Sequence, residues 1–484
     1  MVEKTLEQIL YEKFNYKTFR SGQKEAIQAA LQEVDSVVML PTGSGKSICY
    51  QLPGYIKEGL VLIVSPLLSL MQDQVEKLKS SGERQVAALN SLSSRNEKRR
   101  IMKNLHKFKF LYISPEMIQF DFLMTKLSQL DIALFVVDEA HCISQWGMDF
   151  RPDYLKIGEA KRKLNHPTTM ALTATATEQV RSEIKQSLDI DSIETREIIH
   201  SVDRSSIKLK VEICEGNKKD RLKELVHQLE SPGIVYFSSK KLADEMASVL
   251  RTELGIRAES YHSDLTIDDK IKVQQQFIDN SIQVICATSA FGMGIDKPDI
   301  RYVIHYHMPS NPEMYLQEIG RCSRDGKEGI AILLFEQGDQ YLQIRLQENS
   351  LPDESLLEYI YKYHHKIKQE QADPKVQIAQ FYVNASIPYR VALHQIQTRE
   401  RLKKEQLEYM MNYLFTKGCK RAYLLQYFDE SITVKPERCC SQCTADLETY
   451  FFDNEEDKLV VKSETIDWRV RMKQLYKLDE ESMN

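Results

Sequence analysis

Short apolar runs alternate with longer segments of helical periodicity over roughly the first 340 residues, which is the pattern of a parallel α/β fold. Strands buried on both faces read as unbroken apolar runs rather than as alternating ones. Such runs predict strands at 37–40, 60–64, 110–113, 132–137 and 169–172, and a second set at 233–237, 283–287, 302–306 and 329–335. The two sets predict two sheets.

Between the two sets, segment 191–206 is polar and unpatterned, so we expect a hinge there. From about residue 353 the pattern becomes helical, and a helix is predicted over 398–417 because Gly418 provides a typical end. The expected division is therefore two lobes, 1–200 and 201–345, a helical module at 346–445, and an acidic tail at 446–484 that is near the size below which a segment seldom folds alone.

Composition restricts the possible partners. A net charge of −5 gives no overall basic surface, so nucleic acid would have to bind at local patches. No apolar run reaches the ~20 residues of a membrane span, and the N-terminus lacks a signal-peptide core. Of nine cysteines, four crowd between Cys419 and Cys443, which fits no disulfide framework. We expect a cytoplasmic protein without membrane contact.

The string LPTGSGKS at 40–47 lies between a predicted strand and a predicted helix, the position of an ATP phosphate loop. Gly43 and Gly45 permit backbone N–H groups to point at phosphates. Lys46 would reach the β- and γ-phosphates and Ser47 would ligate Mg²⁺. The residues expected to bind nucleotide here are Thr42, Gly43, Ser44, Gly45, Lys46 and Ser47.

Carboxylates follow the predicted strand 132–137 directly. Asp138 is the expected second ligand of Mg²⁺, and Glu139 would orient or deprotonate the attacking water. His141 is expected to relay between this site and the second lobe. Phosphoryl transfer also needs a cation at the leaving group, for which QEIGRCSRDG (317–326) offers Arg324 as the arginine finger and Arg321 as a second phosphate contact.

Two further cleft positions are predicted from local strings. FNYKTFRSGQ (14–23) suggests an adenine pocket in which Tyr16 stacks, Arg20 flanks and Gln23 reads the base edge. In CATSAFGMGIDKPDI (286–300), Asp296 follows a strand end and a glycine-rich loop and would point toward the cleft.

Aromatic residues follow the acids closely, at Trp146 and Phe150, with Arg151 beside them. Stacking of a base on such a ring is worth roughly 1–3 kcal/mol for any sequence. These three residues are expected to hold a DNA strand, although a buried tryptophan is the structural alternative. Ser65 and Thr173, at predicted strand ends, would contact the phosphates.

Four cysteines near the end of the helical module predict a closed tetrahedral zinc site: Cys419, Cys439, Cys440 and Cys443. Cys440-x-x-Cys443 has the spacing of a zinc knuckle. Adjacent side chains in extended backbone point apart, so either a tight turn redirects one of the pair Cys439–Cys440, or His394 replaces it.

Together these strings resemble the RecQ family of superfamily 2, DEAH-box DNA helicases over about residues 6–445. The matching strings are FRSGQ, LPTGSGKS, VSPLLSLMQDQV, DEAHCISQWGMDFRPDY, ALTATA, ATSAFGMGIDKPDIR and QEIGRCSRDG, followed by the cysteine cluster. The resemblance implies two RecA-like lobes with ATP between them, a zinc module, and 3′-to-5′ unwinding of single-stranded or forked DNA in recombination and repair. A single-stranded DNA-binding protein is a plausible partner.

The chain departs from the family pattern in three places. Cys322 and Ser323 stand where the family usually has alanine and glycine, the cysteine spacing is compressed, and the tail is too short for the usual winged-helix and helical C-terminal domains. Three alternatives stay open on sequence alone: a DNA translocase that does not separate strands, an RNA helicase, and a non-catalytic scaffold.

Overall fold

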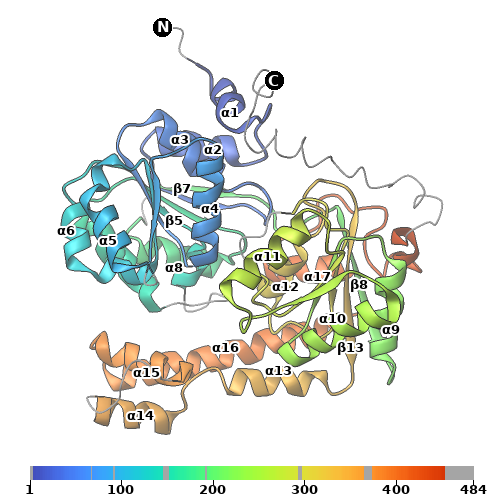
Figure 1. Ribbon diagram of the computed structural model, residues 1–484. Helices are drawn as coiled ribbons and strands as arrows, with labels where there is room; N and C mark the ends of the chain where they lie inside the picture. The colour runs from blue at the N-terminus through green and yellow to red at the C-terminus, as the bar shows by residue number, and fades with distance from the viewer. Residues whose placement is uncertain are drawn as a thin grey trace.

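The computed structural model describes residues 4–66, 68–90, 93–144, 152–190, 193–292, 297–364 and 373–452. These residues form two parallel α/β lobes followed by a helical region (Figure 1). The predicted fold class is therefore confirmed. The predicted tail beyond 452, the loop with Trp146, Phe150 and Arg151, and Asp296 lie outside the described residues.

The first lobe is built on a seven-stranded, all-parallel sheet. In spatial order its strands are β3 (Val86–Leu89), β4 (Phe110–Ile113), β2 (Leu60–Val64), β5 (Ile132–Val137), β6 (Thr169–Thr173), β1 (Ser36–Met39) and β7 (Arg196–Ile199). The helices of this lobe are α1 (Leu6–Phe14), α2 (Gln23–Leu31), α3 (Ile48–Ile56), α4 (Leu68–Ser80), α5 (Arg95–Lys103), α6 (Asp121–Leu127), α7 (Ile157–Lys163) and α8 (Glu178–Ser187).

Alternate side chains along each central strand enter different cores, which explains the unbroken apolar runs. Val37 and Met39 belong to the cluster on one face of the sheet, and Val38 belongs to the cluster on the other face. Every residue of β5 is buried. Both faces are thus covered by helices, and the carboxyl ends of all the strands lie along one edge, where the site forms.

The second lobe holds a six-stranded parallel sheet. Its order is β10 (Ala258–Tyr261), β11 (Val284–Ala287), β9 (Gly233–Tyr236), β12 (Tyr302–His305), β13 (Gly329–Glu336) and β8 (Ile207–Cys214). Its helices are α9 (Lys218–Gln228), α10 (Lys240–Leu254), α11 (Ile267–Ile278) and α12 (Pro312–Ile319).

The C-terminal helices are α13 (Asp339–Glu348), α14 (Glu354–Tyr363), α15 (Pro374–Asn384), α16 (Tyr389–Phe415) and α17 (Lys420–Tyr427). Helix α17 contributes to the cores of both lobes: Leu424 packs in the second, whereas Leu425 and Phe428 pack in the first. Helix α16 begins nine residues before the predicted 398, and α13 crosses the boundary predicted at 345.

The prediction of an unpatterned hinge over 191–206 is wrong in part, because β7 lies inside it and pairs with β1. Strands β3, β8 and β10 were also missed. The missed strands β3, β7, β8 and β10 all lie at sheet edges, and three of the four residues of β7 are exposed. Three of them, β7, β8 and β10, contain charged residues because an edge strand buries only part of its side chains, so they lack the apolar run by which the central strands were found. Strand β3 reads VAAL, an apolar run that the prediction did not include.

Candidate nucleotide and metal sites

The phosphate loop occupies the turn from β1 to α3. Gly43 and Gly45 have φ angles of +82° and +77°, in the left-handed region that glycine adopts without strain. Ser47 occupies the position just before α3, where its hydroxyl makes no capping hydrogen bond. A Cβ added to Gly43 would lie 2.8 Å from Cγ of Arg324. The loop is therefore packed closely against the second lobe.

Two acids lie at the carboxyl end of β5, facing the same cleft as the phosphate loop. Burial, reinforced by the adjacent charge of Glu139, raises the pKa of Asp138 to about 7, while the Lys46 ammonium acts in the opposite direction. A cation in the cleft would relieve this repulsion and keep Asp138 ionised. Oxygen ligands with an excess of negative charge suit Mg²⁺, so Ser47 and Asp138 fit the predicted metal.

His141 is buried beside these acids. Its Nδ1 lies 3.0 Å from Oγ1 of Thr173 at the end of β6 and 3.4 Å from Oε2 of Glu139. Both contacts are within the first lobe, so the predicted relay to the second lobe stays a prediction.

The adenine-pocket residues line the cleft, with Tyr16 half-exposed. The structure gives Gln23 a different set of partners from those predicted. Its Oε1 accepts a hydrogen bond from the backbone N–H of Arg20, and its Nε2 donates to the carbonyls of Ser44 (2.8 Å) and Gly45 (3.1 Å). Arg20 also donates to the Gly43 carbonyl. Both side chains hold the phosphate loop, so reading of a base edge by Gln23 stays a prediction.

The predicted arginine pair reaches the cleft from the second lobe. Arg321 and Arg324 lie in the turn that follows α12. Ser323 has a φ of +60°, which explains why glycine is usual there. Its backbone N–H donates to the Ile300 carbonyl, its hydroxyl donates to the Lys327 carbonyl, and the Cys322 thiol donates to Ile300 and Arg301. Cys322 and Ser323, which differ from the usual residues of the family, therefore anchor the turn.

Together these residues enclose a cleft of about 360 Å³ between the lobes. Asp138, Glu139, Lys46 and Ser47 line it from the first lobe, and Arg321 and Arg324 from the second. The prediction missed Gln74 and Gln317, which also line it. Both lie inside strings quoted for the resemblance, so a signal was present. The arrangement provides a cradle for phosphates, acids for a metal and water, and arginines across a gap.

The predicted DNA contacts receive little direct support from this arrangement. The side chains of Ser65 and Thr173 are both buried, and the Thr173 hydroxyl donates to the Thr175 carbonyl while lying next to His141. Neither hydroxyl is open to a strand here. These contacts therefore stay predictions, as do those of Trp146, Phe150 and Arg151.

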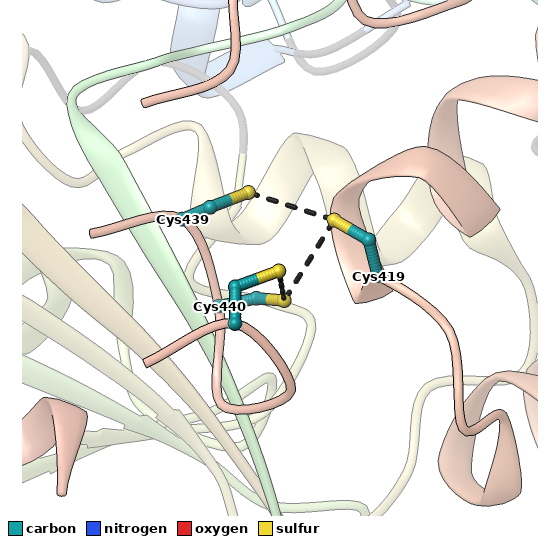
Figure 2. Close-up of side chains that lie close together, drawn as sticks. Cys419, Cys439 and Cys440 are labelled. Carbon is teal, nitrogen blue, oxygen red and sulfur yellow. Dashed lines mark hydrogen bonds between the residues drawn. The ribbon is translucent and has the colours of Figure 1, made fainter. Parts of the chain in front are cut away.

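The four cysteines come together at the start of α17, as Figure 2 shows for three of them. Their sulfurs all lie within 4.8 Å of one another, and the closest pairs are 3.5–3.8 Å apart. Four sulfurs about 2.3 Å from one tetrahedral Zn²⁺ lie about 3.8 Å apart, so the cluster fits zinc. Both Cys439 and Cys440 belong to it, and His394 replaces neither.

A tight turn resolves the problem of the adjacent cysteines. The backbone N–H groups of Cys443 and Thr444 both donate to the Cys440 carbonyl. Cys439 is held by β8, because its carbonyl accepts a hydrogen bond from the Leu209 N–H. The metal would therefore connect α17 to the edge of the second sheet.

Comparisons with known proteins match most of the chain to helicase families. Three family models match: DEAD/DEAH box helicase at 20–183, helicase conserved C-terminal domain at 217–326, and RecQ zinc-binding at 375–446. The probable ATP-dependent DNA helicase RecS of Bacillus subtilis is 43% identical over 94% of this chain and 95% of its own length. The ATP-dependent DNA helicase RecQ of the same organism is 37% identical over 89% of this chain, which spans 65% of that longer protein.

Solved structures share the fold at low sequence identity. The DNA-bound DUF1998 helicase MrfA has a TM-score of 0.58 at 18% identity, covering 71% of this chain and 50% of its own. The DEAD-box helicase Mss116 bound to single-stranded RNA has a TM-score of 0.59 at 16% identity, covering 84% and 90%. Among the described residues, no helix has the length and hydropathy needed to cross a bilayer.

Proposed function

Because the chain belongs to the RecQ family of ATP-dependent DNA helicases, we propose that it moves 3′-to-5′ along one DNA strand and unwinds duplex or forked DNA in recombination and repair. The cleft carries this proposal: a phosphate loop and a DEAH carboxylate pair in one lobe face two arginines in the other. ATP bound there touches both lobes, so its hydrolysis changes how they sit together.

The proposed roles follow the geometry. Lys46 and the loop N–H groups hold the phosphates, Glu139 orients the attacking water, and Arg324 with Arg321 stabilises charge on the transferred phosphoryl group. Mg²⁺ held by Ser47 and Asp138 would neutralise the phosphate oxygens. Lobes 1–200 and 201–345 form the motor, and 346–445 forms the zinc module.

Trp146, Phe150 and Arg151 are proposed to contact the strand and report its presence to Asp138 and Glu139, which are close in sequence. The substrate is single-stranded or forked DNA in the cytoplasm, and a single-stranded DNA-binding protein is an expected partner.

The test measures ATP turnover with no nucleic acid, with a DNA oligonucleotide and with RNA of the same sequence, using Lys46→Ala as the control. We expect DNA to stimulate turnover and the variant to have none. Indifference to DNA would refute the proposal, and stronger stimulation by RNA would favour an RNA helicase.

Polarity is measured with duplexes that carry a 3′ or a 5′ single-stranded overhang. Only the 3′ overhang is expected to support unwinding. Displacement of streptavidin from the strand without any unwinding would instead indicate a DNA translocase.

A further inference from the structure

A single arginine in the segment that joins the two sheets connects both sides of the nucleotide cleft. Arg204 lies just before β8, and its side chain is partly buried. Nη1 donates to the Thr42 carbonyl of the phosphate loop at 2.8 Å. Nη2 donates to the Ser323 carbonyl at 2.7 Å and to the Cys322 carbonyl at 3.2 Å, in the turn that carries Arg321 and Arg324.

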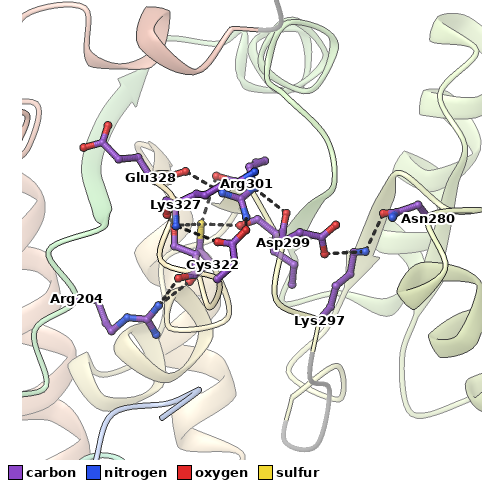
Figure 3. Close-up of polar contacts among 11 residues, drawn as sticks. Arg204, Asn280, Lys297, Asp299, Arg301, Cys322, Lys327 and Glu328 are labelled. Atoms are coloured by element: carbon purple, nitrogen blue, oxygen red, sulfur yellow. Dashed lines mark hydrogen bonds and ion pairs between the residues drawn. The ribbon is translucent and has the colours of Figure 1, made fainter. Parts of the chain in front are cut away.

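Figure 3 shows the Arg204 side chain pointing at the turn that contains Cys322. A further bond reaches the Gly320 carbonyl at 3.3 Å. The acceptors of these bonds are backbone carbonyls. Burial lowers the pKa of Arg204, but a guanidinium stays charged in proteins. Its planar fork can reach carbonyls on two sides at once, which an ammonium group cannot do in the same way.

The zinc module holds this segment from the other side. Arg421, two residues after the zinc ligand Cys419, donates to the Asp203 carboxylate, to the Arg204 carbonyl at 3.1 Å and to the Ile207 carbonyl. Glu430 accepts hydrogen bonds from the Ser201 hydroxyl and from the Val202 N–H. The backbone of the joining segment is thus fixed before and after Arg204.

We propose that Arg204 is a positioning residue that sets the distance between the phosphate loop and the Arg321–Arg324 turn, and that the zinc module keeps it in place through Arg421. This inference rests on the proposed ATPase function. Thr42 belongs to the first lobe and Ser323 to the second, so Arg204 satisfies both carbonyls only when the cleft is closed. It therefore acts on turnover, in which Arg324 must reach the phosphates, rather than on the initial binding of ATP.

The test compares Arg204→Ala and Arg204→Lys with wild type at saturating DNA. Misplacement of a reacting group by about 1 Å can cost ~10²-fold in rate, so we expect kcat to fall by on the order of 10²-fold in Arg204→Ala. The ATP Kd, measured with a fluorescent analogue, should change by less than about threefold. Arg204→Lys should recover little, because lysine lacks the fork.

Arg251→Ala is the matched control. Arg251 also donates to a backbone carbonyl, that of Ala258, but it lies in α10 beside β10, at the opposite edge of the second sheet from β8, and it does not line the cleft. It should keep wild-type kcat. Equal kcat in Arg204→Ala and Arg251→Ala, or a parallel loss of kcat and ATP affinity, would overturn the inference.

A double-mutant cycle separates positioning from a general loss of structure. If Arg204 acts through Arg324, then adding Arg204→Ala to Arg324→Ala should cause little further loss, whereas independent effects would multiply. Asp203→Asn weakens the ion pair between Asp203 and Arg421 without altering Arg204, and it should lower kcat. Added to Arg324→Ala, it should cause little further loss, as Arg204→Ala does. If the losses of Asp203→Asn and Arg324→Ala multiply, the link to the zinc module is refuted. Wild-type protein lacking DNA-stimulated turnover would refute the proposed function itself, so the two failures are distinguishable.

Discussion

Glu313→Gln tests whether a buried carboxyl group between α12 and the C-terminal helices lowers the free energy of unfolding at neutral pH. Glu313 lies in the first turn of α12, where its Oε1 accepts hydrogen bonds from the Tyr427 hydroxyl (2.7 Å) and from Gln406 (3.2 Å). Oε2 is buried and has no hydrogen-bond partner among the described residues. Burial raises the pKa of Glu313 from its ordinary 4.5 to about 7.

The sign of the pH dependence follows from proton binding. Between about pH 4.5 and 7 the folded chain keeps a proton on Glu313 that the unfolded chain has released, so the free energy of unfolding falls as pH rises. Each pKa unit corresponds to about 1.4 kcal/mol. The free energy of unfolding that protonated Glu313 contributes below about pH 4.5 therefore falls by at most about 3 kcal/mol once the pH exceeds 7. Glutamine does not titrate and escapes this loss.

The assay follows urea unfolding midpoints of wild type and Glu313→Gln at several values between about pH 5 and 8. We expect the variant to gain stability relative to wild type across this range. Glu348→Gln, an exposed position in α13, is the control and should follow wild type. A constant difference between Glu313→Gln and wild type would refute the reasoning, as would a protonated-carboxyl infrared band of Glu313 that has already disappeared when the pH is raised to 5.

Four other predictions concern the two sites. Arg324→Ala should bind ATP normally but lose ~10³-fold in turnover, as for other arginine fingers; normal single-turnover hydrolysis would exclude the role. Gly43→Ala should lower turnover, because its Cβ would lie 2.8 Å from Cγ of Arg324 at a φ of +82°; wild-type steady-state kinetics would show that the closed cleft differs from this one. Cys443→Ser should lose zinc and then solubility, and a folded, zinc-free variant in metal analysis would count against a structural ion. Burial raises the pKa of the Cys322 thiol to about 12, so mass spectrometry should find it alkylated only after unfolding; rapid native labelling would contradict this.

The sequence predicted best what depends on neighbouring residues. Strands β2, β4 and β5 were found with correct bounds because they are central and buried on both faces. Strand β8 reads IKLKVEIC, in which Lys208 and Lys210 interrupt the apolar run. It lies at the sheet edge, where alternation replaces the unbroken run, so the pattern used for the central strands could not find it.

The site residues also divide into those that a local string predicts and those that only long-range packing brings together. The phosphate loop and the DEAH acids are local strings whose spacing carries their chemistry. Arg204 is 162 positions from Thr42 and 119 from Ser323. Only the packing of the lobes brings these groups together, and no local pattern distinguishes Arg204 from other arginines in polar segments. The partners of Gln23 were missed for a related reason, since spacing shows a residue type but not which backbone groups fold against it.

Helix α17 packs into the cores of both lobes, and this determines how the chain can be shortened. Leu425 and Phe428 complete the apolar interior of the first lobe, and Leu424 completes that of the second. A fragment ending before Cys419 would contain both complete sheets and every proposed catalytic group, yet it would expose apolar surface on each half. Such a fragment should aggregate when it is expressed, so the smallest well-behaved motor extends through the cysteine cluster.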